Sequence, residues 1–206
     1  ALGNDNNVNG ENSTAIGTQS TADGINALAI GAGAKAHVTN PAANSNKPGN
    51  LVAIGTSAEA TAAETVAIGE SAKASKHNAN AFGSKAKAEG ESSLALGSGS
   101  YAKEDSSVAI GNDSNATAKS SVALGESTNA TAIFATAVGD SATASGVRSF
   151  AAGLNSKAQS DDSIAIGANT SSTVRGISIG AEASAYHQGI SVGYKSNASG
   201  IGSIAT

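Results

Sequence analysis

The segment at residues 107–125, SVAIGNDSNATAKSSVALG, holds the pattern that decides the fold. Its opening motif, Ser-Val-Ala-Ile-Gly at 107–111, returns 14 residues later as Ser-Val-Ala-Leu-Gly at 121–125. The glycine of this motif, or of a variant of it, recurs along the chain at Gly3, Gly17, Gly31, Gly55, Gly69, Gly83, Gly97, Gly111, Gly125, Gly139, Gly153, Gly167, Gly180 and Gly193. Ten of the thirteen intervals are 14 residues, one is 24 and the last two are 13. A fixed period of this kind indicates a solenoid, in which each repeat packs only on its neighbours.

Each repeat contains two alternating segments. Before the glycine, large apolar residues flank an alanine, as Val108 and Ile110 flank Ala109. This alternation is typical of a short strand with one broad apolar face and one small face. A second alternation follows the glycine, as in Ala72-Lys73-Ala74. Each repeat therefore predicts two short strands joined by two tight corners, with the glycine in one corner because it lacks a Cβ.

Stacked repeats predict an all-β solenoid of 14-residue coils, with two parallel sheets and alanine inside. We expect one repeat domain over 1–206 with about 14 coils, and irregular 13-residue repeats at 168–193. The large apolar residues then form an outward stripe, and soluble monomers rarely expose such a stripe. Self-association is therefore predicted, through Ile16, Leu28, Ile30, Val52, Ile54, Val66, Ile68, Phe82, Leu94, Leu96, Val108, Ile110, Val122, Leu124, Phe150, Ile164, Ile166, Ile177 and Ile179.

Composition excludes several other classes of protein. The chain has 206 residues with 44 alanines, 31 Ile, Val and Leu residues, and no Cys, Met or Trp. Twelve basic and 16 acidic residues give a net charge of −4, so no basic surface is expected for nucleic acid. The lack of cysteine excludes disulfides and zinc-thiolate sites, and we expect no cofactor, no metal site and no enzyme. No apolar run has the length of a membrane span.

The motifs at 107–111, 121–125 and 163–167 resemble the YadA-like head of trimeric autotransporter adhesins. The resemblance covers essentially the whole chain. It implies a left-handed parallel β-roll that forms a homotrimer through its large apolar face, on the surface of a Gram-negative bacterium after export across the outer membrane. It also implies attachment to collagen, fibronectin, laminin or host cell receptors and, in some members, autoagglutination.

Full-length members of that family carry further segments. A signal peptide, a neck motif, a heptad stalk and a membrane-anchor barrel are not found in this sequence. We therefore expect an excised head fragment, whose only link to a membrane would be a C-terminal anchor outside it. A segment of the same fibre that acts purely as a structural spacer, with no ligand of its own, is the alternative function.

An insertion interrupts the period between Gly31 and Gly55, where ten extra residues fall near 38–49. Insertions in solenoids emerge as loops, and loops carry function more often than scaffolds do. Asn40, Asn46 and Lys47 are therefore the candidate ligand contacts. A tolerated surface insertion is the competing interpretation, because longer loops cost little closure entropy.

Asn80 interrupts the apolar pattern beside Phe82. In a trimer three copies would meet near the axis, where buried amides need partners, so Asn80 is a candidate axial polar site. A local break with the side chain turned to solvent is the alternative. The acidic pair Asp161 and Asp162 falls at a corner, as does Glu104-Asp105, and turn formation explains both pairs better than catalysis does.

Three other solenoid functions fit less well. Left-handed hexapeptide acyltransferases need coils of about 18 residues, made of three hexads each. Ice-binding solenoids need an outward threonine ladder, but here that column is mixed, at Thr21, Lys35, Glu59, Lys73, Lys87, Tyr101, Asn115 and Asn129. A Ca²⁺-binding nonapeptide roll needs an aspartate ladder that the sequence lacks.

Overall fold

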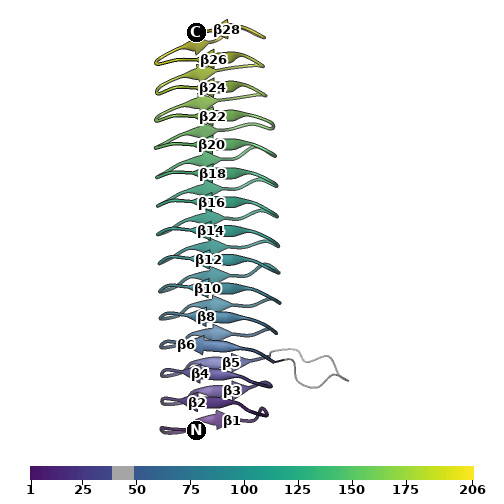
Figure 1. Cartoon of the computed structure of the whole chain (residues 1–206), viewed down its shortest axis with the longest axis vertical. Helices are drawn as coiled ribbons and strands as arrows, with labels where there is room; N and C mark the ends of the chain where they lie inside the picture. The colour runs from purple at the N-terminus through teal and green to yellow at the C-terminus, as the bar shows by residue number, and fades with distance from the viewer. Residues whose placement is uncertain (39–48) are drawn as a thin grey trace. The chain divides into compact units, whose positions relative to one another are not determined.

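The computed structural model describes residues 1–38 and 49–206. These residues contain no helix, and they form short parallel strands of two or three residues each. Two compact units are distinguished, an N-terminal unit at Ala1–Ser106 and a C-terminal unit at Ser107–Thr206. The prediction of an all-β parallel solenoid with coils of about 14 residues is confirmed in both units. Figure 1 shows the strands of each unit stacked in successive coils.

The N-terminal unit has two parallel sheets. Even-numbered strands form one sheet in the order β2 (Thr14–Ile16), β4 (Leu28–Ile30), β6 (Val52–Ile54), β8 (Val66–Ile68), β10 (Asn80–Phe82) and β12 (Leu94–Leu96). Odd-numbered strands form the other, in the order β1 (Asn7–Val8), β3 (Thr21–Asp23), β5 (Lys35–His37), β7 (Glu59–Ala60), β9 (Lys73–Ala74), β11 (Lys87–Ala88) and β13 (Tyr101–Ala102).

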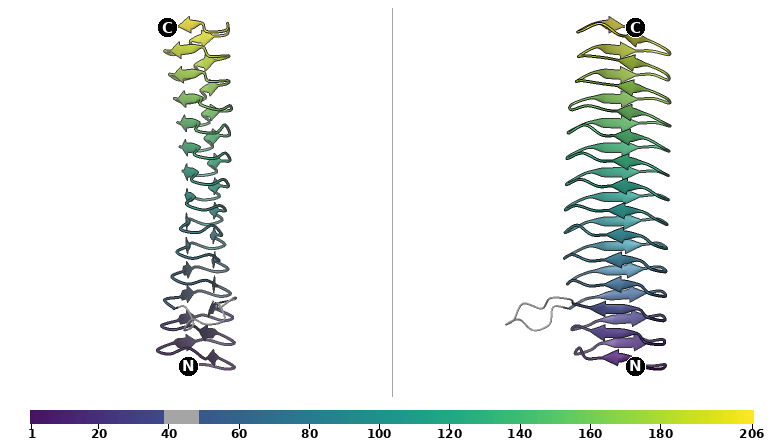
Figure 2. Two further views of the ribbon diagram at one scale, coloured as in Figure 1. Left: turned by 90° about the vertical axis from the view of Figure 1, so that its right-hand side faces the viewer. Right: turned by 180° about the vertical axis from the view of Figure 1, so that it is seen from behind.

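The C-terminal unit repeats this arrangement. Its even-numbered sheet contains β14 (Val108–Ile110), β16 (Val122–Leu124), β18 (Thr136–Val138), β20 (Phe150–Ala152), β22 (Ile164–Ile166), β24 (Ile177–Ile179), β26 (Ile190–Val192) and β28 (Ile204–Ala205). Its odd-numbered sheet contains β15 (Asn115–Ala116), β17 (Asn129–Ala130), β19 (Thr143–Ala144), β21 (Lys157–Ala158), β23 (Ser171–Ser172), β25 (Ser184–Ala185) and β27 (Asn197–Ala198). Figure 2 separates the two sheets as two layers.

The interior of each coil is built from alanine and serine. In the coil that begins at Gly111, Ala116 and Ala123 are fully buried, as the sequence predicts, and so are Ser114 and Ser121. The hydroxyl of Ser121 donates to the Ala118 carbonyl at 2.6 Å, and that of Ser114 donates to the Gly111 carbonyl at 3.0 Å. These two serine hydroxyls therefore add a second hydrogen bond to corner carbonyls that also accept the backbone amides of Ser121 and Ser114.

The two corners of a coil differ in what they require. The glycine corner follows each even-numbered strand, as at Gly111–Asp113, and the second corner follows each odd-numbered strand, as at 117–120. Gly111 has a φ of +130°, and a Cβ there would collide with the Gly125 carbonyl of the next coil. In this coil each corner also holds one left-handed residue that is not glycine, Asp113 (φ 51°) and Ser120 (φ 55°), whereas Gly33 and Gly99 stand at the position of Asp113 in two other coils. The sequence interpretation had assigned a special conformation only to the glycine.

The register continues on both sides of the insertion. Asp23 pairs with His37 and Ala36 pairs with Ala60, while the Asn50 amide donates to the Ile25 carbonyl at 2.9 Å. Gly49 belongs to the coil as well, because its carbonyl accepts the Glu64 amide at 3.1 Å. Counting from these flanking residues assigns the ten extra residues of the sequence to 38–47, after β5.

Candidate interaction surfaces

The outward side of each even-numbered sheet carries two apolar columns. The first column holds the first residue of each strand and the second column holds the last, so that Val108 pairs with Val122 and Ile110 pairs with Leu124. All the side chains predicted for self-association lie in these columns, and none is fully buried. Leu96 is 43% exposed and Ile179 is 39% exposed. The two columns in each unit are named here its apolar face.

The apolar face has no covering within the described part of either unit. The odd-numbered sheet packs on the opposite, alanine side of the even-numbered sheet. Ala109 and its alanine equivalents are fully buried there. Large Ile, Val and Leu side chains therefore contact water on one side along several consecutive coils. Contiguous apolar patches of this kind mark association sites in soluble proteins.

Asn80 lies on the apolar face of the N-terminal unit and is half-buried. Its Nδ2 donates to the Asn78 carbonyl at 2.9 Å, and Asn78 is the left-handed residue of the second corner, with a φ of 58°. Asn115 and Asn129 make the same bond to the residue two positions earlier, both at 2.8 Å. The amide group of Asn80 therefore has a local partner, and its role as an axial polar site stays a prediction.

The outward side of the odd-numbered sheet is polar and mixed in charge. Lys35 Nζ lies 3.3 Å from Glu59 Oε1, and the Tyr101 hydroxyl donates to Glu89 Oε2 at 2.8 Å. Burial, together with this hydrogen bond, raises the pKa of Tyr101 to about 12. Lys87 Nζ lies 5.9 Å from the centroid of the Tyr101 ring. These side chains pair with one another along the sheet and present no single charge.

A shallow cavity of about 410 Å³ lies on this polar side of the N-terminal unit. It is lined by Asn7, Thr21, Asp23, Lys35, His37, Glu59 and Thr61. His37 Nδ1 lies 3.7 Å from Asp23 Oδ2. His37, in this lining, is the last residue of β5 before the insertion in the sequence. Asn40, Asn46 and Lys47, the predicted ligand contacts, lie outside the described residues.

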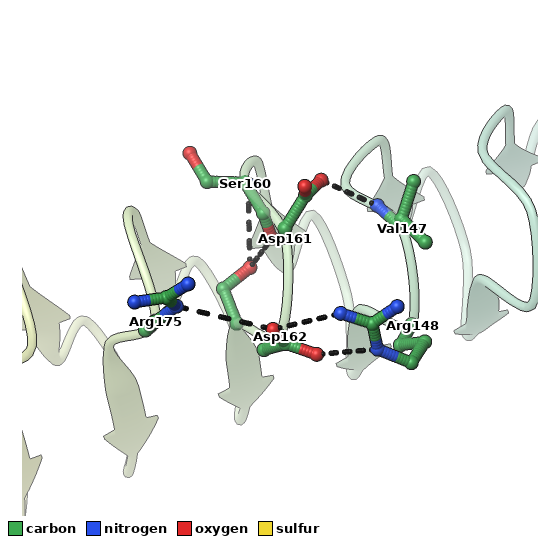
Figure 3. A network of polar contacts seen from close by, with 7 residues as sticks. Val147, Arg148, Ser160, Asp161, Asp162 and Arg175 are labelled. Atoms are coloured by element: carbon green, nitrogen blue, oxygen red, sulfur yellow. Dashed lines mark hydrogen bonds and ion pairs between the residues drawn. The ribbon is translucent and has the colours of Figure 1, made fainter.

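Charged residues at the second corners of the C-terminal unit join successive coils. Arg148 donates through Nε to Asp162 Oδ1 at 2.7 Å and through a terminal nitrogen to Asp162 Oδ2 at 3.0 Å (Figure 3). Arg175 Nε lies 4.0 Å from the same carboxylate. The hydrogen bond from Arg148 lowers the pKa of Asp162, and the same bond raises the pKa of Arg148. Asp161 Oδ1 accepts the backbone amide of Val147 at 2.9 Å.

The other acidic pair has the same structural use. Asp105 Oδ1 accepts the Glu91 amide at 2.9 Å, one coil earlier in the N-terminal unit. Asp105 and Asp161 therefore each fasten their own second corner to the second corner of the previous coil, which explains their position without catalysis. Among the described residues no group of three or more His, Asp or Glu side chains could hold a metal ion.

Sequence reasoning missed an exposed apolar pair at the second corner of the coil that begins at Gly125. Ile133 is 45% exposed and Phe134 is 58% exposed. Phe134 also has a φ of 59°, which is unusual for an aromatic residue. Phe134 is one of only three phenylalanines and the only one outside the apolar columns, which was the available signal.

The fold and these surfaces define the class of protein. It is a parallel β-solenoid in which the even-numbered sheet of each unit has an apolar outward side and the odd-numbered sheet a polar one. The model of the YadA head domain repeat matches residues 1–34, 52–170 and 187–206, in overlapping windows of two repeats. The chain belongs to this family. Its members are structural domains of trimeric autotransporter adhesins, which form fibres on the bacterial surface, and the family is not one of enzymes.

No curated protein sequence matches the chain at a significant level. No helix among the described residues is long and apolar enough to cross a membrane.

Proposed function

We propose that three copies of this chain pack through their apolar faces and form an adhesin head that attaches a bacterium to host matrix proteins or cell receptors. The observation that carries the proposal is the uncovered apolar face in each unit, beside membership of a family of trimeric surface adhesins. Collagen, fibronectin and laminin are the matrix ligands that the resemblance implies. No catalytic activity is assigned to the chain.

Energetics support coupled folding and assembly. A fully buried Ile, Val or Leu side chain contributes about 1.5–3 kcal/mol, whereas alanine removes far less area from water. An isolated chain has an alanine interior and leaves its large side chains half-exposed, against a backbone ordering cost of about 1–2 kcal/mol per residue. Burying the apolar face between copies would add the missing apolar contribution, so we expect folding and trimer formation to occur together.

Sedimentation equilibrium and light scattering of the chain test the assembly. A trimer that dissociates only as its β circular dichroism signal disappears is the expected result. A folded monomer would contradict the proposal, since the apolar face would then be tolerated in water.

Binding needs a separate measurement. The trimer is screened against collagens, fibronectin, laminin and host cells, with a heat-unfolded sample as the control. Saturable binding to one of them supports an adhesive head. A trimer that binds none would favour the alternative function, a structural spacer of the surface fibre.

A further inference from the structure

Two phenylalanines lie on the apolar faces, and each shares its strand with an unusually small or polar residue. In the N-terminal unit Phe82 stands in the second column of β10, whose first-column residue is Asn80. In the C-terminal unit Phe150 stands in the first column of β20, whose second-column residue is Ala152. Among the three-residue even-numbered strands of the described part of the chain, Ala152 is the only alanine in the second column and Asn80 the only asparagine in the first.

Packing inside one chain does not require this pairing of sizes. Residues two apart on a strand are separated by about 6.6–6.8 Å, so a phenylalanine leaves room for a large neighbour on its own strand. Along the sheet Ala152 pairs with Val138 and Ile166, which are both larger. Phe150 remains 36% exposed, so contacts within the chain bury only part of this residue.

Assembly around a three-fold axis would bring the large residue of one copy beside the small or polar residue of the next. This step rests on the proposed trimer. When three identical faces point to one axis, each face meets the next side to side. The first column of one copy then adjoins the second column of its neighbour. Phe150 of one copy would meet Ala152 of the next, and Phe82 would meet Asn80 of the next.

We propose that these two phenylalanines set the axial register of the trimer, each filling the space beside the small or folded-back residue of the same coil in the neighbouring copy. The bond from Asn80 Nδ2 to the Asn78 carbonyl turns that amide toward its own corner and leaves space on the face. Both units therefore carry one size-matched pair.

Register needs such a device because, apart from Thr14 and Thr136 in the first column, the other residues of the two columns are Ile, Val or Leu. Repeated Val and Ile side chains would fit almost equally well after a slip by one coil, and uniform strands specify register weakly. A one-coil slip would instead press Phe150 against Val138 or Ile166 of the neighbour and leave a gap beside Ala152. Overpacking and cavities both destabilise a packed interface.

The exchange variant Phe150→Ala/Ala152→Phe tests the pairing, because it keeps the composition and reverses the columns. Alone, it should form trimers whose thermal midpoint lies within about 5 °C of wild type, since each junction again joins Phe to Ala. Co-expressed with differently tagged wild-type chain, it should self-sort. Mixed junctions would join Phe to Phe or Ala to Ala, so native mass spectrometry should find mixed trimers depleted below their random share.

A matched control exchanges two exposed residues away from the apolar face, Lys157 of β21 and Gln159 just after that strand. This variant, Lys157→Gln/Gln159→Lys, should mix with wild type at random. Random or enriched mixing of the Phe150/Ala152 exchange variant would overturn the proposal, as would its failure to assemble while wild type is trimeric. A second measurement co-expresses the single variants Phe150→Ala and Ala152→Phe, which should be enriched in mixed trimers. Random mixing there would also overturn it. A monomeric wild-type chain would instead contradict the proposed assembly itself.

Discussion

The 14-residue coils and the two 13-residue coils of the C-terminal unit differ at only one place. In both types three residues separate the motif glycine from the next odd-numbered strand, and the even-numbered strands stay in register, with Ile164 paired to Ile177. The missing residue is lost at the second corner. A backbone turn spans Ser160 to Ser163 in a regular coil and Thr173 to Gly176 in a short one, where it begins one residue sooner after the odd-numbered strand.

The shortened second corner explains why residue 176 is a glycine. The inward position before the even-numbered strand is Ser163 in the regular coil and Gly176 in the short coil, and both are buried. A Cβ on Gly176 would lie 2.7 Å from the Thr173 oxygen and 2.9 Å from the Ser172 hydroxyl. In the sequence, the insertion at 38–47 also follows an odd-numbered strand, β5. Both departures from the period thus leave the glycine corner and the apolar face intact, which is expected if the face is the constrained surface.

The largest effect is expected from a charge on the apolar face. Ile110→Asp in a regular coil and Ile179→Asp in a short coil should each place three like charges near the axis, at a cost of about 3–5 kcal/mol per unpaired buried charge. Sedimentation with circular dichroism should show loss of both trimer and β structure. Gln159→Asp on the opposite, exposed side is the control and should assemble normally. Tolerance of Ile179→Asp alone would mean that the short coils lie outside the interface.

The second-largest effect distinguishes the second corner of a short coil from the second corner of a regular coil. Gly176→Ala should destabilise the protein by about 1–3 kcal/mol, because the added methyl group meets the Thr173 and Ser172 oxygens. Ser163→Ala, at the equivalent position of a regular coil, removes a hydroxyl bond to the Ser160 carbonyl and should cost about 1 kcal/mol. Thermal unfolding of both variants measures the difference. Equal costs would show that the shortened corner relaxes around the methyl group.

A smaller effect concerns Asp162, whose carboxylate contacts Arg148 of a regular coil and Arg175 of a short coil. Arg148→Gln should raise the pKa of Asp162 toward its ordinary value, and Arg175→Gln should raise it less, because Arg175 Nε lies 4.0 Å away. The folded-state pKa is lowered, so the pair stabilises the fold above the ordinary carboxyl pKa of about 4 and loses this contribution as pH falls through the lower folded value. Carboxyl chemical shifts recorded against pH measure both variants. A larger shift in Arg175→Gln would contradict this assignment.

The smallest effect on stability is expected from removing the insertion. Deletion of Val38–Lys47 joins His37 to Pro48 and restores a 14-residue coil, so the thermal midpoint should move by less than about 3 °C. Deleting Val38–Gly49 instead would also remove the carbonyl that accepts the Glu64 amide, and it serves as the less stable comparison. If Asn40, Asn46 and Lys47 contact a ligand, binding should fall in the shorter deletion. Unchanged binding would assign the insertion no part in recognition.

Much of this molecule follows from its sequence because the fold repeats. Two columns of large residues around Ala109 and its equivalents predict the strands, their orientation and the outward apolar face. The left-handed conformations of Ser120 and Phe134 were not predictable in this way, since neither residue type signals a positive φ. The partner of the Asn80 amide was also beyond the pattern, because it depends on the turn at Asn78.

The period, the alanine interior and the apolar face were determined by the sequence alone, because alternation of side-chain size along a strand directly assigns each residue to one side of a sheet. Only the tertiary structure decided how the shortened and interrupted coils keep register, and which corner groups join one coil to the next. Corners carry a periodic glycine but no alternation of large and small side chains from which a conformation could be predicted. Their conformations follow from backbone carbonyls, such as those of Gly125 and Thr173, that come close only once neighbouring turns are folded.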